Sequence, residues 1–339
     1  MTQSIKIDKW TSGAHYDRWM GRWSRLLAQE FLKWMAVPMG LRWIDVCCGS
    51  GVVTEAIVEL SAPAGAAGVD ASADQISFAR EHRAYPNVSF ETGDATALHF
   101  PDSGFDVAVC GLGLNYIPNP ALALKEFRRV IRPGGTVAVY VWDYAEGARF
   151  LREFWDVAIA VDSEAASFDQ AQRFPMCTQE GLRSLFEQAK LEDADVHGLD
   201  ILTRFTDFND YWEPLLTGQG SAPNYLATRG EQIRTAIRER LRVTLLTNAE
   251  GAIELLRAPG RFAGRRSFSP SVSLSLFIYF YSCYVNYAHD YAEIIPAIPI
   301  SSCPAVPKAW FGTRGTRLLD LRTAVDLKTK TPGKWFPGS

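Results

Sequence analysis

The sequence predicts an α/β protein with a parallel sheet that carries helices on both faces. Between residues 41 and 144, short apolar runs alternate with amphipathic helical patterns. The runs are nearly continuous in apolar residues, which is typical of strands covered on both faces. Such strand–helix alternation brings consecutive strands into one parallel sheet, because each helix crosses back over a face of that sheet.

Five strands and three helices account for this stretch. The strands are expected at 42–46, 66–72, 88–95, 105–114 and 136–142, and the helices at 52–60, 73–84 and 121–131. The third helix sets apolar residues at spacings of three and four against charged ones. It is expected to end before Pro133 and Gly134, because both residues terminate helices.

The stretches around this core are interpreted as additions to it. Residues 1–40 are expected to form a helical lid, since Trp23, Leu27 and Phe31 share one apolar helix face. Residues 41–260 form the expected main domain, with a helical insert at about 145–250. Within and after the insert, helices are predicted at 180–190 and 230–246, and late strands at 193–205 and 251–258.

The last part, 261–339, is interpreted as a poorly ordered tail. Residues 267–288 carry no charge, are rich in Ser, Tyr and Phe, and show no amphipathic period. A membrane anchor at 267–288 is the alternative, but Ser and Asn interrupt the run and it falls short of a clean span. The main domain is therefore expected to end near Gly260, and deletion of the residues after 262 should leave cooperative folding intact.

Composition argues against several classes of function. The net charge of −3 and the lack of a Lys/Arg block argue against a nucleic-acid partner, whose phosphates need a basic field. The six cysteines form no pair of zinc knuckles, and no metal site is predicted. The N-terminus has no apolar stretch of signal-peptide length, so a cytoplasmic protein with reduced thiols is expected.

The first candidate site follows the first strand. Asp45 lies near the end of that strand, Gly49 and Gly51 lie in the turn after it, and a helix begins directly beyond. Glycine allows positive φ and close approach of a ligand to the backbone. The free N–H groups and positive dipole end of the helix suit a carboxylate, a ribose edge or a phosphate.

Acidic residues follow the next two strands as well. Asp70 ends the second strand, where a carboxylate can accept from both hydroxyls of a ribose. Asp94 follows the third strand, where its carboxylate can accept from the amine of an adenine beside the backbone N–H of Ala95. The alternatives are a solvated loop residue for Asp70 and a helix cap for Asp94. Ligands of open parallel sheets bind at the carboxyl ends of strands, so three features there indicate a nucleotide-type site.

The stretch from about His15 to Tyr144 resembles the class I S-adenosylmethionine (SAM)-dependent methyltransferases, in particular the type 11 group that includes quinone-biosynthesis C-methyltransferases. WIDVCCGSG is similar to the glycine-rich first motif of that family, Asp70 to its ribose-binding acid, and GDA to its adenine-binding motif. FPDSGFDVAVCGLGLNYIPNP and ALKEFRRVIRPGGTVAV are similar to the regions that follow. The resemblance implies a Rossmann-like, seven-stranded, mostly parallel sheet with a helical cap, whose last strands come from 194–258.

The resemblance also implies SAM as the cofactor and a small molecule as the methyl acceptor. The residues expected to bind SAM are Tyr16, Asp45, Cys47, Gly49, Gly51, Asp70, Ala71, Asp94, Ala95, Gly111 and Leu112. Cys47 stands where the family usually has its first glycine, and weaker or altered binding is the most that this departure predicts. Small buried residues are favoured over reactive thiols for Cys47 and Cys48.

Candidates on the acceptor side are fewer, because SAM carries an activated methyl group and positioning can supply most of the rate. His15 and Tyr16 lie in the expected lid, His15 as a base and Tyr16 as a contact of the amino-acid end of SAM. Asn115, Tyr116, Trp142 and Tyr144 follow the fourth and fifth strands and are candidates for the pocket wall. Ordinary packing is the alternative for each of them.

Two other functions compete with methyl transfer. An NAD-dependent oxidoreductase shares the strand, the turn and the second acid, but the third glycine of its motif would fall on Thr54 or Val52. An inactive methyltransferase-fold binding protein is the other, and turnover of any acceptor would exclude it. The acceptor, its accepting atom and the oligomeric state are left open.

Overall fold

The computed structural model describes residues 20–191, 194–216, 220–255 and 280–286. Within them, one seven-stranded sheet has the order β3-β2-β1-β4-β5-β9-β6. Its strands are β1 (Arg42–Val46), β2 (Gly65–Asp70), β3 (Val88–Thr92), β4 (Phe105–Gly111), β5 (Ile131–Trp142), β6 (Asp195–Leu199) and β9 (Phe280–Asn286). Neighbours from β3 to β5 pair in parallel, and β9 is antiparallel to both β5 and β6. The predicted fold class, a mostly parallel seven-stranded sheet, is confirmed.

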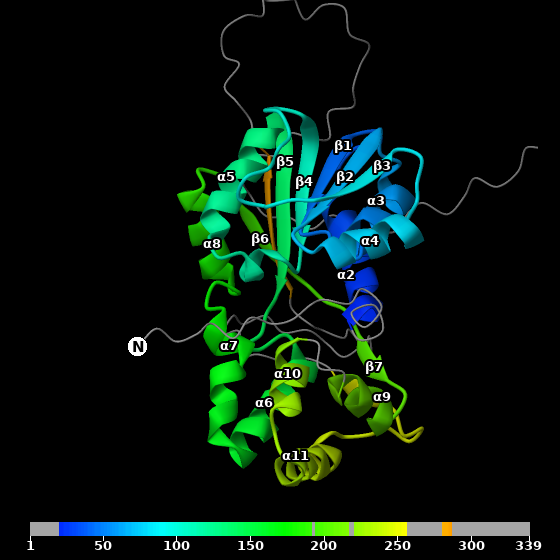
Figure 1. The fold of residues 1–339 in the computed structure, drawn as a ribbon, viewed down its shortest axis with the longest axis vertical. Coiled ribbons are helices and arrows are strands. Elements are labelled where there is room, and N and C mark those ends of the chain that lie inside the picture. The colour runs from blue at the N-terminus through cyan, green and yellow to red at the C-terminus, as the bar shows by residue number, and fades with distance from the viewer. Residues whose placement is uncertain (1–19, 192–193, 217–219, 256–279, 287–339) are drawn as a thin grey trace, which may run out of the picture. The chain divides into compact units, whose positions relative to one another are not determined.

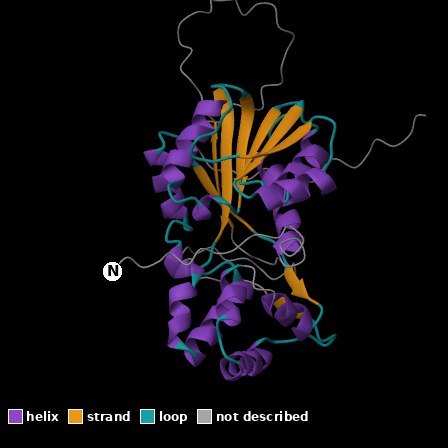
Figure 2. Cartoon of the chain, viewed as in Figure 1, coloured by secondary structure: helices purple, strands orange, loops and turns teal. Residues whose placement is uncertain are grey.

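Helices cover both faces of this sheet, as Figures 1 and 2 show. One side carries α2 (Arg22–Met35), α3 (Val52–Ser61) and α4 (Ala73–His82), and the other carries α5 (Pro120–Val130) and α8 (Gln179–Gln188). On α2, Leu27 and Phe31 are one turn apart and fully buried, and the ring of Phe31 lies 4.6 Å from that of Tyr140 on β5. The part of the expected lid that α2 represents is therefore a packed helix of the sheet layer, and residues 1–19 lie outside the described residues.

The helix α5 shows how local sequence sets an element's limits. The side chain of Asn119 accepts a hydrogen bond from the backbone N–H of Leu122 at 3.0 Å, and Pro120 takes the first helical position. Both are typical helix starts. The helix ends at Val130, close to the predicted end, but β5 begins at Ile131 and is longer than the predicted strand at 136–142.

The remaining described elements are mostly helical. They are α6 (Arg149–Val161), α7 (Gln170–Arg173), α9 (Phe208–Trp212), α10 (Ser221–Ala227) and α11 (Glu231–Thr244), with 3-10 turns η2 (Leu114–Tyr116), η3 (Ser163–Phe168) and η4 (Glu213–Leu216). Two short strands, β7 (Thr203–Phe205) and β8 (Ile253–Leu255), pair antiparallel in a sheet of their own. These elements fill the range expected for the helical insert, although α8 packs against the main sheet. The domain limits themselves stay predictions.

The prediction that the last strands of the sheet come from 194–258 is wrong for one of them. β6 does lie in that range, but the strand between β5 and β6 is β9, beyond the expected domain end at Gly260. The segment FYSCYVN is aromatic and β-branched without a period of two. A strand with a neighbour on each side in a covered sheet needs no such period, so the sequence pattern did not predict β9. The rest of the expected tail lies outside the described residues.

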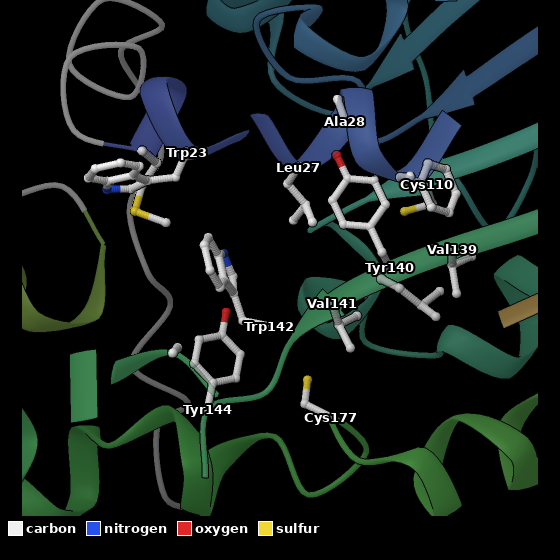
Figure 3. Packing of buried hydrophobic residues seen from close by; sticks show 14 of the residues in the cluster. Trp23, Leu27, Ala28, Cys110, Val139, Tyr140, Val141, Trp142, Tyr144 and Cys177 are labelled. Carbon is white, nitrogen blue, oxygen red and sulfur yellow. The ribbon is translucent and has the colours of Figure 1, made fainter. Parts of the chain in front are cut away.

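The strand β5 carries the centre of the core and one wall of the site. Figure 3 shows Tyr140 and Trp142 on one side of this strand and Val139 and Val141 on the other. All four side chains are buried. Tyr144 continues the first set two positions further on, so the alternation of a strand gives one row of three aromatic rings.

Candidate functional site

A cavity of about 510 Å³ opens at the carboxyl ends of β1, β2, β4 and β5. Eight of the eleven residues predicted to bind the cofactor line it, namely Cys47, Gly49, Asp70, Ala71, Asp94, Ala95, Gly111 and Leu112. We call these eight residues the sheet side. Asp45 and Gly51 do not line the cavity, and Tyr16 lies outside the described residues, as does His15.

The turn after β1 is held by the second acidic residue. The backbone N–H of Gly49 donates to one carboxylate oxygen of Asp70 at 2.9 Å, and the N–H of Ser72 donates to the other oxygen at 2.9 Å. Burial raises the pKa of Asp70, and these two hydrogen bonds oppose that rise. A carboxylate has about four lone-pair sites, so Asp70 can accept further hydrogen bonds from a ligand in the cavity.

Asp45 lies beneath this turn and does not line the cavity. Its carboxyl is fully buried and accepts a hydrogen bond from the hydroxyl of Thr54 at 2.6 Å. Its other oxygen has no hydrogen-bond partner among the described residues. Burial raises the pKa of Asp45 to about 7, because a charged carboxylate without solvent is costly. Asp45 can therefore support the turn from below, and its contact with the cofactor stays a prediction.

Packing favours glycine at position 51, and the contact of Gly51 with the cofactor stays a prediction. Its φ is +85°, and a Cβ there would lie 2.9 Å from Cδ of Arg83 and 3.1 Å from the ring of Phe90. Arg83 in turn donates to the carbonyl of Ser50 at 2.5 Å. A side chain at position 51 would therefore be strained in the backbone and would displace the arginine that holds the turn.

Asp94 lies at the expected place after the third strand, and it also makes a capping contact, which was the alternative role. One of its oxygens accepts from both the backbone N–H and the hydroxyl of Thr96, each at 2.8 Å. These bonds lower the pKa of Asp94, so the carboxylate stays charged. The residue thus caps its own turn and also lines the cavity beside Ala95.

Cys47 takes a backbone conformation that favours glycine, with φ +59°. The neighbouring thiol of Cys110, together with burial, raises the pKa of Cys47. A thiol with a raised pKa is a poor nucleophile, which supports the predicted packing role. A Cβ at Gly113 would lie only 2.4 Å from Cβ of Cys47, so these two positions constrain each other.

The opposite wall of the cavity comes from segments far apart in the sequence. We call Tyr116, Trp142, Tyr144, Leu151, Gln170 and Ser221 the aromatic side. The sequence predicted the aromatic residues Tyr116, Trp142 and Tyr144 for this wall. It did not predict Leu151, Gln170 or Ser221, which come from helices of the insert. No local pattern marks them, since Gln170 and Ser221 begin α7 and α10 and resemble ordinary helix starts. Asn115 is buried but does not line the cavity.

The two sides differ in what they can bind. The sheet side offers two carboxylates and a turn with exposed backbone, which suit the hydroxyls of a ribose and the amine of an adenine. The aromatic side offers rings with a few neutral polar groups, which suit a flat apolar molecule. Among the described residues, no cluster of His, Cys, Asp or Glu could hold a metal ion. No helix in the same part of the chain is long and apolar enough to cross a membrane.

The chain is similar in sequence to known proteins. The family model described as a methyltransferase domain matches residues 39–190. A demethylmenaquinone methyltransferase of Staphylococcus aureus (strain JH9) is 33% identical over 173 residues, which are 48% of this chain and 72% of that protein.

Solved structures with a similar fold include the YcgJ protein from Bacillus subtilis, which is 16% identical, with 79% of this chain and 99% of that chain covered and a TM-score of 0.45. An S-adenosylmethionine-dependent methyltransferase from Mesorhizobium loti is 27% identical, with 35% of this chain and 56% of that chain covered and a TM-score of 0.32. The family match at 39–190 includes β1 to β5 and every residue of the sheet side.

Proposed function

Because this chain belongs to the class I SAM-dependent methyltransferases, we propose that the sheet side of its cavity binds SAM and that the aromatic side binds the methyl acceptor. The enzyme transfers a methyl group to a small molecule. When bound, SAM supplies a methyl group activated on a sulfonium, so the protein has mainly to hold and orient two ligands. The observation that carries the proposal is that both sides line one cavity of about 510 Å³.

The roles on the sheet side follow from the hydrogen-bonding capacity of each residue. Asp70 would accept from the ribose hydroxyls, since its carboxylate is already fixed by the N–H groups of Gly49 and Ser72. Asp94 and the backbone of Ala95 would hold the adenine. Cys47 and Gly49 would place backbone groups against the amino-acid end of SAM. Asp45 and Gly51 would act only through the turn.

The acceptor that this cavity suits is small and mostly apolar. The Staphylococcus aureus relative is named for an acceptor of the quinone class, demethylmenaquinone. The aromatic row on β5 and the neutral lining beyond it support an acceptor with a flat ring. A nucleic-acid acceptor is not part of the proposal, because the chain carries a net charge of −3. A cytoplasmic location stays a prediction.

Titration calorimetry tests the cofactor assignment. S-adenosylhomocysteine (SAH), the product that SAM leaves behind, should bind with a one-to-one stoichiometry, and NADH should not bind. Binding of NADH without SAH would overturn the proposal. Because an inactive protein of the same fold would also bind SAH, the second measurement is transfer of labelled methyl from SAM to a panel of quinols and phenols. A panel without any turnover would favour the inactive binding protein.

A further inference from the structure

Two phenol oxygens meet at the wall of the cavity. The hydroxyl oxygens of Tyr116 and Tyr144 lie 3.4 Å apart, and both residues line the cavity. Tyr116 ends the turn η2 after β4, and Tyr144 lies two residues beyond β5. Because β4 and β5 are paired neighbours in the sheet, the segments that carry the two tyrosines leave the sheet side by side.

The neighbours of this pair hold both rings in place. The ring of Phe174 packs edge-on against Tyr116, with centroids 5.2 Å apart, and against Tyr144 at 5.8 Å. The guanidinium of Arg173 lies 5.0 Å from the centre of the Phe174 ring and donates to the hydroxyl of Ser221 at 2.8 Å. A pair whose rings are fixed by packing can present its oxygens to a ligand with little loss of side-chain entropy.

A neighbouring amide lies on the same wall. The Nε1–H of Trp155 donates to Oε1 of Gln170 at 2.6 Å, and Gln170 lines the cavity. The charged residues among the described lining are Asp70 and Asp94, both on the sheet side. The aromatic side therefore has neutral hydrogen-bonding groups on an apolar wall and no described charge that would favour a cationic acceptor.

We propose that Tyr116 and Tyr144 together bind an oxygen substituent on the ring of the methyl acceptor, and so select hydroxylated or carbonyl-bearing aromatic and quinoid rings. This inference rests on the function proposed above. Phenol hydroxyls can both donate and accept hydrogen bonds, and the two oxygens lie 3.4 Å apart in the lining of one cavity. A carbonyl or hydroxyl oxygen on a ring can therefore interact with this pair, whereas a hydrocarbon ring offers it no polar group.

The test compares two probes that differ in one group, 2-naphthol and 2-methylnaphthalene. Their dissociation constants are measured by calorimetry, with and without saturating SAH, on the wild type, Tyr116→Phe, Tyr144→Phe and the double variant. Phenylalanine keeps each ring and its packing, so only the hydroxyls are removed. Tyr85→Phe is the matched control, because the Tyr85 hydroxyl lies 3.4 Å from Glu55 and Tyr85 does not line the cavity.

The measured quantity is the ratio of the two dissociation constants, so that a general change in the cavity cancels. We expect the preference for 2-naphthol to fall about tenfold in the double variant, less in each single variant, and not at all in Tyr85→Phe. A ratio that stays within about twofold of the wild type, or a wild type that binds neither probe, would overturn the inference. If SAH fails to bind while the ratio still falls, the proposed cofactor site is wrong and the phenol pair stands.

Discussion

The two sides of the cavity are assembled in different ways. On the sheet side, each residue lies at the end of a strand of the parallel sheet or shortly after it, so the order of strands brings the residues together. On the aromatic side, Leu151, Gln170 and Ser221 from α6, α7 and α10 join the aromatic residues that follow β4 and β5 only because the insert packs against the sheet. A site formed by strand ends can therefore be predicted from a sequence, whereas a site formed by the packing of helices becomes visible only in the structure.

Removal of the strand β9 should have the largest effect on the folding of the chain. Deletion of the residues after 262 removes β9, which lies between β5 and β6. We expect loss of cooperative unfolding in thermal denaturation, because β5 and β6 both lose their hydrogen-bonded neighbour. This is the opposite of what the sequence alone suggested for the same deletion.

The matched control for this deletion removes only residues 291–339, which lie outside the first compact unit of the chain. That variant should unfold cooperatively at the wild-type Tm. A truncation at 262 that also keeps the wild-type Tm would mean that β9 contributes nothing to the sheet.

Asp70→Ala should weaken binding on the sheet side and leave binding on the aromatic side nearly unchanged. The carboxylate that fixes Gly49 and Ser72 and faces the cavity is lost, so SAH affinity should fall about 100-fold, the value of two charge-assisted hydrogen bonds. Binding of 2-naphthol without SAH should stay within about twofold, because Asp70 lies on the sheet side. Asp102→Ala, an exposed carboxylate paired with Arg129, is the control. Equal losses for SAH and naphthol would show that the two sides are not independent.

Asp45→Asn should distinguish support of the turn from contact with the cofactor. The folded protein holds the pKa of Asp45 near 7, above its ordinary value of 3.8. As pH rises from 4 to 7, the unfolded chain loses this proton and the folded protein keeps it, so the wild type loses stability over that window. Asn cannot ionise and can still accept from Thr54.

The variant should therefore gain stability relative to the wild type between pH 4 and 7.5, by about 4 kcal/mol at the upper end. Urea unfolding of both proteins across that range measures the difference, and SAH affinity should change little. A stability difference that is the same at every pH would mean that Asp45 is ionised in the folded protein.

Substitutions at Cys47 and Gly113, which lie close together, should have the smallest effects, and these are effects on stability. Gly113→Ala should destabilise the wild type by about 2 kcal/mol, because the new Cβ would lie 2.4 Å from that of Cys47. Cys47→Gly alone should change stability by less than about 1 kcal/mol, since relief of the positive φ is offset by a more flexible unfolded chain.

In the double variant Cys47→Gly, Gly113→Ala, the cost of the alanine should fall by about half, which a denaturant double-mutant cycle can measure. Additive costs would show that the backbone at 113 moves to avoid the contact.

The sequence predicted the parallel core well, because each strand and helix of that core carries its own local signals. All five strands of the core were placed, and Asp70 and Asp94 were correctly assigned to strand ends. Asp45 and Gly51 were placed at the right turn, but only packing shows that one lies beneath it and the other avoids Arg83.

Other features depend on contacts between distant segments and have no local signal. Gln170 and Ser221 reach the cavity only through the packing of α7 and α10. β9 was missed because a strand inside a covered sheet needs no alternating pattern, so its sequence did not stand out from the rest of the uncharged stretch at 267–288. The contact of α2 with β5 was likewise hidden, because an apolar helix face does not say what it will cover.

The position of β9 sets a condition on how the chain is made. During synthesis from the N-terminus, β1 to β5 emerge and can pair long before residues 280–286 leave the ribosome. Until then, the outer edge of β5 has open backbone groups and β6 has no strand beside it, which is a template for aggregation. A nascent chain stalled before residue 280 should therefore expose an unprotected sheet edge, and holdase chaperones should bind this enzyme most strongly during that interval.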